Sequence, residues 1–195
     1  MEKIIIGYSI CGYDNDSYML RDKENNFLTT LKRCSICGEL LKKKDIPTDK
    51  FNLKKQLDFS ATYDGFTICS QRFVDFYDFR SYSGLNFDPI KSTPGYYVIS
   101  VENSNILEFD AIERKTRFMD KKECCKRYES IVGATPVYLK SPDRLKDGVF
   151  YRTDLEFGSG DEKSPLLLVA LKTGKEIKQE NFRGIDFGEI LKEIL

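Results

Sequence analysis

The sequence predicts an α+β (mixed α/β) fold in which a central sheet, or sheets, is built from two repeated strand-helix-strand units, with a cysteine zinc knuckle beside them. Three observations lead to this prediction: apolar runs separated by turn residues, two segments that align without gaps at an offset of 100 residues, and a CxxCG motif. A chain of 195 residues buries roughly 70% of the surface that its unfolded form exposes, enough for a core without disulfides or metal. We therefore expect residues 1–195 to form a single domain.

The first predicted element is a buried strand over residues 3–9. The apolar stretch around it ends at Asp14 and is too short and too polar for a signal peptide. No apolar run approaches the ~20 residues that span a bilayer, so we expect a cytoplasmic protein without a membrane partner. Cysteines in a reducing cytoplasm are packing residues or metal ligands before they are disulfides. Cys11 and Cys69 lie in apolar strand patterns and are expected in the core.

A lysine-rich segment follows at residues 32–55, with Lys42, Lys43 and Lys44 at its centre. Surfaces that bind single-stranded nucleic acid combine basic grooves with several aromatic residues, whereas Phe51 is the only aromatic residue in this segment. The whole chain has 31 Lys plus Arg against 31 Asp plus Glu and so lacks the basic excess of a nucleic-acid-binding protein. We expect a solvated surface connection and no nucleic-acid partner.

The first strand-helix-strand unit covers residues 65–90. After an apolar strand, Ser70 stands at a helix N-cap position, and the next residues place Phe73, Phe76 and Tyr77 on one helical face. Gly84 stands where the helix has ended and a left-handed residue is favourable. An alternating strand then follows.

The second unit covers residues 165–190 and contains an apolar strand, a helix over residues 172–181 with Gly174 inside it, and Gly184 before a final strand. Both units end in the pattern Gly-apolar-Asx-Phe-x-x-Ile. Short strand-helix-strand segments also resemble one another by coincidence, so the pattern alone leaves duplication and coincidence both open.

Further strands are expected between the units, bounded by turn residues such as Thr93-Pro94-Gly95; they cover residues 96–101, 106–109, 136–139 and 149–157. In the last of them Arg152, Asp154 and Glu156 share one face. We favour an internal network between the arginine and the two acids, over a partner-binding face or a solvated strand.

The metal prediction rests on Cys34 and Cys37, which with Gly38 form a CxxCG knuckle that turns two thiolates toward one ion. A tetrahedral site needs two more ligands, and the chain has no histidine, so Cys124 and Cys125 are the candidates. Adjacent cysteines both reach one ion only at a turn or bulge. The alternatives are a decayed second pair without metal and a thioredoxin-like redox pair, although redox CxxC sites usually open a helix.

Catalytic motifs are mostly absent from the sequence. Without histidine there is no Ser-His-Asp or Cys-His pair and no HExxH site, and the P-loop-like residues 173–176 and the glycine-rich residues 158–163 lack required positions. Asp143, followed by Asp161, Glu162 and Lys163, has the residue order of a PD-(D/E)xK nuclease, in which acids hold a divalent metal ion. A charged surface loop explains the same residues, so we expect no catalytic residue and no enzyme.

Taken together, several short motifs resemble the bacterial double-CxxCG motif proteins; they lie at residues 34–38, 64–73, 84–89, 124–125 and 150–157. Some members of that family are similar to immunity proteins, which neutralise toxins delivered by neighbouring cells, and the two CxxCG motifs imply a structural zinc ion. The chain departs from the family at Cys124-Cys125-Lys126, which has neither the spacing nor the glycine of a second motif.

The resulting hypothesis is a non-enzymatic cytoplasmic binding protein that occludes a cognate toxin, with structural zinc on Cys34, Cys37, Cys124 and Cys125. A PD-(D/E)xK-like nuclease is the alternative enzyme. A zinc-stabilised adaptor for another partner is the third hypothesis.

Overall fold

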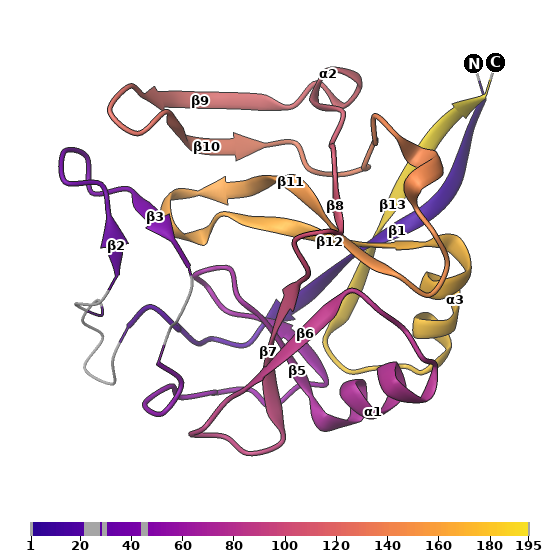
Figure 1. The fold of residues 1–195 in the computed structure, drawn as a ribbon, viewed down its shortest axis with the longest axis horizontal. Helices are drawn as coiled ribbons and strands as arrows, with labels where there is room; N and C mark the ends of the chain where they lie inside the picture. The colour runs from indigo at the N-terminus through magenta and orange to yellow at the C-terminus, as the bar shows by residue number, and fades with distance from the viewer. Residues whose placement is uncertain (1, 22–27, 29–30, 44–46, 195) are drawn as a thin grey trace.

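The computed structural model describes residues 2–21, 28, 31–43 and 47–194. Strands dominate it, with α-helices between them, so the predicted mixture of the two is confirmed (Figure 1). The strands are β1 (Glu2–Asp14), β2 (Lys32–Arg33), β3 (Leu40–Lys42), β4 (Phe59–Ala61), β5 (Thr67–Ser70), β6 (Leu85–Pro89), β7 (Tyr96–Val101), β8 (Ile106–Leu107), β9 (Arg117–Lys122), β10 (Arg127–Val132), β11 (Phe150–Ser159), β12 (Ser164–Ala170) and β13 (Ile185–Ile194). The helices are α1 (Gln71–Phe79), α2 (Ala111–Arg114) and α3 (Leu171–Gln179), with 3-10 turns η1 (Pro142–Arg144) and η2 (Gly160–Glu162).

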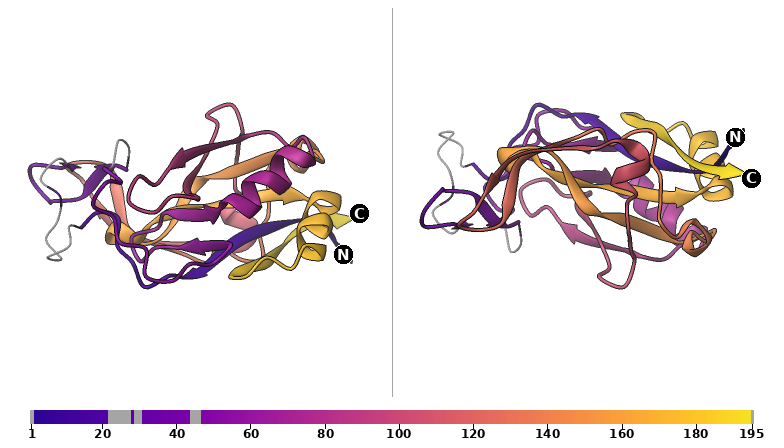
Figure 2. Two further views of the ribbon diagram at one scale, coloured as in Figure 1. Left: turned by 90° about the horizontal axis from the view of Figure 1, so that it is seen from below. Right: turned by 90° about the horizontal axis from the view of Figure 1, so that it is seen from above.

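Eleven of the strands form one mixed sheet. Its strand order is β6-β7-β5-β4-β1-β12-β11-β10-β9, and in addition β13 pairs with β1 and β8 pairs with β11. The pair β2-β3 forms a separate two-stranded sheet. Because β1 and β13 are antiparallel along most of their length, the two chain ends lie side by side (Figure 1). The β2-β3 hairpin lies at the opposite end of the molecule from the termini (Figure 2).

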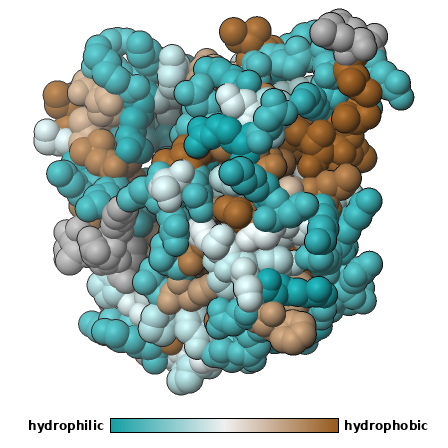
Figure 3. All heavy atoms as spheres, turned by 45° about the vertical axis from the view of Figure 1, so that its right-hand side comes forward, coloured by the Kyte–Doolittle hydropathy of each residue, from teal (hydrophilic) through white to brown (hydrophobic). Residues whose placement is uncertain are grey.

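Strand β1 is longer than predicted and is buried only in its middle, at Gly7, Ser9 and Ile10. Pairing with β12 begins at Gly7, so residues 2–5 have β13 as their only strand neighbour and are exposed. The predicted burial of residues 3–9 is therefore wrong at its start, where Ile4 and Ile5 are exposed together with Ile194. On the face shown in Figure 3, hydrophilic residues cover most of the surface and hydrophobic residues gather at the upper right.

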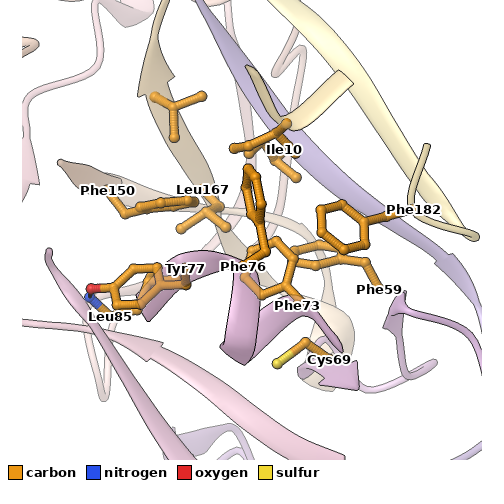
Figure 4. Close-up of a cluster of buried hydrophobic side chains, with 12 residues drawn as sticks. Ile10, Phe59, Cys69, Phe73, Phe76, Tyr77, Leu85, Phe150, Leu167 and Phe182 are labelled. Carbon is orange, nitrogen blue, oxygen red and sulfur yellow. Dashed lines mark hydrogen bonds between the residues drawn. The ribbon is translucent and has the colours of Figure 1, made fainter. Parts of the chain in front are cut away.

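An aromatic core forms around α1, and we use this name for the buried cluster drawn in Figure 4. The predicted face of α1 is confirmed, because Phe73, Phe76 and Tyr77 are all buried. The ring of Phe73 lies 5.1 Å from that of Phe59 and 5.3 Å from that of Phe182, centroid to centroid. Rings at these distances contribute beyond the area that they bury.

Both predicted units contain a strand, a helix and a second strand. Helix α1 begins after Ser70, but the Ser70 hydroxyl makes no capping hydrogen bond and instead donates to Asp58, at 3.2 Å, so the predicted cap is wrong in that respect. Gly84 and Gly184 have φ angles of 98° and 86°, as predicted for left-handed residues beyond a helix. In α3, a Cβ added to Gly174 would lie 2.3 Å from the Tyr8 ring, which explains a glycine inside a helix.

Several strand predictions need correction. Residues 136–139 form no strand but only isolated bridges, in which Val137 pairs with Ile190 and Leu139 with Phe109. The strand predicted at residues 106–109 is shortened to β8, and the β9-β10 hairpin was not predicted at all.

Two further predictions about burial are wrong. Cys69 is buried as predicted, but Cys11 is exposed, because it lies on the opposite face of β1 from the buried Ile10. The lysine-rich segment is not simply solvated, since Phe51 and Leu53 are buried within it. Lys44 lies outside the described residues.

The predicted network within β11 is also wrong. Among the described residues, Arg152 forms no ion pair with Asp154 or Glu156, and its guanidinium donates instead to the carbonyl of Thr153, at 3.2 Å. Asp154 accepts the backbone N–H of Phe109, at 2.8 Å. The register of β11 on β12 shifts between residues 152 and 156, which breaks the regular face on which the prediction depended.

Candidate metal centre

The structure brings together the four predicted cysteines, Cys34, Cys37, Cys124 and Cys125, which we call the four-cysteine cluster. All four sulfur atoms lie within 4.8 Å of one another. The closest pairs are Sγ of Cys34 with Sγ of Cys124, at 3.8 Å, and Sγ of Cys37 with Sγ of Cys125, at 3.7 Å. Both pairs join the two hairpins, so the cluster connects segments that are far apart in the sequence.

The sulfur spacing fits a tetrahedral metal site. With zinc–sulfur bonds of about 2.3 Å, the sulfurs of a regular tetrahedron lie about 3.8 Å apart. A disulfide would instead place two sulfurs about 2.05 Å apart, and all six cysteines of this chain are free thiols. The donor set of four sulfurs and no oxygen favours a soft or borderline metal such as zinc over magnesium or calcium.

The first cysteine pair is positioned by the tight turn between β2 and β3. The backbone N–H of Gly38 donates to the carbonyl of Cys34 at 2.9 Å, and Cys34 N–H donates to the carbonyl of Glu39 at 2.8 Å. Gly38 has a φ of 74°, a left-handed conformation that favours glycine. The backbone N–H groups of Cys37 and Ile36 lower the pKa of the Cys34 thiol to about 7, which favours the thiolate that a metal needs.

The second pair lies in the turn that joins β9 to β10, and this is the turn that two adjacent cysteines require. The N–H groups of Cys125 and Lys126 both point to the carbonyl of Lys122, at 3.3 and 2.7 Å, and Lys126 has a φ of 59°. The sulfurs of Cys37 and Cys34 raise the pKa of Cys124 to about 12. Clustered thiols disfavour further negative charge in this way, whereas a bound cation makes ionisation favourable.

A buried carboxylate next to the CxxCG motif, that of Glu39, connects the residues around the cluster. Glu39 is only 5% exposed, and its two oxygens accept from Lys163 at 2.6 Å and from Lys122 at 2.8 Å. Burial acts to raise the pKa of Glu39, but the two ammonium groups outweigh it and hold the pKa below its ordinary value. Because Lys122 ends β9, this carboxylate joins the two hairpins below the thiols.

Two arginines add further links around the cluster. Arg33 makes a bidentate pair with Asp161, at 3.1 and 2.6 Å, and also donates to the carbonyl of Gly38 at 3.0 Å. Arg127 of β10 donates to the carbonyl of Leu41 in β3, at 2.8 Å. The hairpins are thus tied to one another and to the turn before β12 by charged hydrogen bonds.

The residues of the nuclease pattern have other contacts. Asp143 is exposed on η1 and pairs with Lys192 at 2.9 Å, whereas Asp161 pairs with Arg33 and the buried Lys163 with Glu39. Within the described part of the chain, the four-cysteine cluster is the only group of three or more cysteine or acidic residues close enough to share a metal ion.

Sequence reasoning missed the charged pairs that support the cluster, although it singled out Asp161 and Lys163 for a nuclease pattern. Glu39 directly follows the CxxCG motif, which is a weak signal, but its partner Lys163 lies 124 positions away. Arg33 and Asp161 are separated by 128 positions. Pairs of this kind leave no local pattern, so spacing within the sequence does not reveal them.

A scan of the sequence against models of protein families finds no match, and a search of curated proteins finds none either. No helix in the described part of the chain has the length and apolar character needed to cross a bilayer.

Proposed function

We propose that the four-cysteine cluster binds a structural zinc ion that joins the β2-β3 and β9-β10 hairpins. One observation carries the proposal: four thiols from segments 88 to 90 positions apart converge at the spacing of a zinc–sulfur tetrahedron. Four protein ligands complete the coordination of zinc, and a site without an open position is structural rather than catalytic.

Metal analysis of the purified protein tests this proposal. We expect about one zinc ion per chain after preparation with sufficient zinc, as four thiolates per ion require. The variants Cys124→Ser and Cys37→Ser should each lose most of the metal. The control is Cys11→Ser, which changes an exposed cysteine outside the cluster, in β1, and should keep the metal. Zinc below about 0.2 per chain in the wild-type protein would contradict the proposal.

We propose further that the protein acts in the cytoplasm as a binding protein that occludes a partner, as the immunity proteins of the family that it resembles do. The support is that resemblance and the closed coordination of the cluster, which suits a scaffold rather than a reaction. A toxin encoded by a neighbouring gene is the partner to test. Expression of this chain should protect cells from that toxin and purified chain should capture it; unchanged sensitivity of the cells would reject the proposal.

We infer in addition that residues 65–90 and 165–190 are two copies of one strand-helix-strand unit. The support is their equal layout, since α1 and α3 each have nine residues and begin directly after a strand. In both units an antiparallel strand lies between the other two: β7 separates β5 from β6, and β1 separates β12 from β13. Homologous sequences test this inference, because duplication requires the two segments to align with each other in other members too.

A further inference from the structure

A groove of about 420 Å³ lies between two parts of the sheet, with β5 and β7 on one side and β11 and β12 on the other. This volume is within the range of small-molecule sites, which is about 300 to 1,000 Å³. Its apolar lining consists of Leu41, Phe66, Ile99, Val101, Pro165 and Leu167. Neither the zinc proposal nor the occlusion proposal assigns a role to this groove.

Two basic residues on the groove lining, Arg152 and Lys43, form no ion pair among the described residues. The half-buried Arg152 donates only to the carbonyl of Thr153, at 3.2 Å, which leaves most of the N–H groups of its guanidinium available. The ammonium of Lys43 donates to the carbonyls of Asp64 and Lys163, at 2.7 and 2.6 Å. Burial lowers the pKa of Lys43 to about 8, and the nearby carboxylates of Glu156, Asp64 and Asp161 oppose this effect.

The acids on the groove lining form no ion pair with Arg152 among the described residues. Glu156 forms an ion pair with a different arginine, Arg127, whose guanidinium lies 3.9 Å from its carboxylate. Glu102 stands on the wall formed after β7, without an ion pair in the described part of the chain. Lys163, also on the lining, is already neutralised by Glu39 at 2.6 Å.

We propose that the groove binds a small organic molecule with an apolar body and one carboxylate, and that Arg152 holds the carboxylate. Arginine presents a planar fork of N–H donors that matches a carboxylate in a bidentate pair, and a partly buried setting strengthens that pair relative to water. The apolar residues of the groove lining then cover the body of the ligand, as in most small-molecule sites.

Two probe molecules of equal shape test the proposal: 2-naphthoate, which has a carboxylate, and 2-naphthamide, which is neutral. Binding is measured by titration of the full-length, zinc-replete protein, followed by calorimetry or by NMR shifts. We expect 2-naphthoate to bind at least about tenfold more tightly than 2-naphthamide, because a charge-assisted bidentate pair replaces a neutral contact. NMR shifts should concentrate at β7, β11 and β12.

The variants Arg152→Gln and Arg152→Lys separate the roles of charge and geometry. Arg152→Gln should reduce the affinity for 2-naphthoate about tenfold or more and leave the affinity for 2-naphthamide unchanged, whereas Arg152→Lys should lie between the two proteins. Arg144→Gln is the matched control, since Arg144 is an exposed arginine on η1, and it removes the same charge without touching the groove. Circular dichroism shows that each variant is folded before its affinity is compared.

Three results would overturn the proposal. The first is the absence of 2-naphthoate binding at millimolar concentration. The second is equal affinity for the two probes in the wild-type protein. The third is the same loss of affinity in Arg144→Gln as in Arg152→Gln, which would mean that net charge rather than the groove attracts the anion. Each result is independent of the zinc content and of protection against a toxin.

Discussion

The aromatic core and the four-cysteine cluster are held together by different physical effects. In the core, Phe59, Phe73 and Phe150 are completely buried, and burial of such side chains is the main favourable term in folding. Around the cluster, by contrast, five of the six residues of β9 are exposed, and the buried residues of the β2-β3 hairpin are Glu39 in its turn and Leu40 in β3. Thiols and charged hydrogen bonds therefore add to the pairing of β10 with β11 and to the burial of Ile131, and we expect a bound metal to add to them as in small zinc-binding domains.

The aromatic core and the four-cysteine cluster therefore differ in the interactions that stabilise them, and their stabilities should respond to different changes. The aromatic core needs no ligand, because its contacts are present as soon as the chain folds. The strands next to the cysteines have few buried apolar residues, and under the zinc proposal the bound ion adds to their stability. The following predictions test how far the two regions are independent.

Removal of the metal should have the largest effect, and the effect should be local. Metal ligation stabilises zinc-finger peptides by on the order of 10 kcal/mol, and here it links hairpins with little core of their own. A strong chelator should therefore remove the hydrogen-exchange protection of residues 117–132 and 32–42, while α1 and β5 remain protected. Exchange measured by mass spectrometry gives this map. Equal loss of protection along the whole chain would contradict the separation of the two regions.

Phe73→Ala should have the next largest effect, and it should act on the core. Phe73 is fully buried, and truncation of such a ring costs about 3–5 kcal/mol through lost contacts and the cavity that remains. Denaturant unfolding followed by circular dichroism measures the loss. The control is Phe79→Ala in the same helix, because Phe79 is 82% exposed and its removal should change stability by about 0.5 kcal/mol or less. Equal losses in the two variants would be inconsistent with this assignment of the core.

Glu39→Gln should weaken the connection between the hairpins while the thiols stay in place. The substitution leaves the buried ammonium of Lys163 without a countercharge, and breaking a buried ion pair costs about 3 kcal/mol or somewhat more. We expect faster hydrogen exchange in β3 and β9 and weaker retention of zinc under mild chelation. Glu123→Gln serves as the control, because the Glu123 side chain is 71% exposed and pairs only with Lys126. If both variants retain zinc equally, the carboxylate does not support the cluster.

The sequence predicted the aromatic core better than it predicted the hairpins around the four-cysteine cluster. The spacing of Phe73, Phe76 and Tyr77 showed which face of α1 is buried, because an amphipathic helix leaves a local pattern. The β9-β10 hairpin leaves no such pattern, since its first strand is polar and mostly exposed. Its turn was nevertheless implied by Cys124 and Cys125, which need one in order to face a common ion.

Failures at the other positions have the same physical origin. Cys11 follows an apolar run and was assigned to the core, but neighbouring residues in a strand point to opposite faces, and Ile10 has the buried side. The network predicted from Arg152, Asp154 and Glu156 required a regular strand, and the register shift in β11 removes that regularity. Tertiary features of this kind have no signature in spacing alone.

Disruption of the ion pair between Arg33 and Asp161 should change the free energy of unfolding least among the predicted substitutions. The two hydrogen bonds of this pair, at 3.1 and 2.6 Å, attach the first hairpin to the turn before β12. A double-mutant cycle of Arg33→Gln and Asp161→Asn should give a coupling free energy of about 1 kcal/mol, because the pair is bidentate and only partly exposed. The same cycle at Lys192 and Asp143, whose carboxylate side chain is 89% exposed, should give about 0.5 kcal/mol or less.

The difference between these two cycles tests whether geometry, rather than charge alone, holds the hairpin in place. Coupling should be measured in the zinc-bound protein and again after chelation. If the bound ion holds the hairpin against the turn, the coupling between Arg33 and Asp161 should fall when the metal is removed, while the coupling between Lys192 and Asp143 should not change. A coupling that is the same with and without metal would mean that the charged contacts position the hairpin by themselves, and the four-cysteine cluster would then be a consequence of that position rather than its cause.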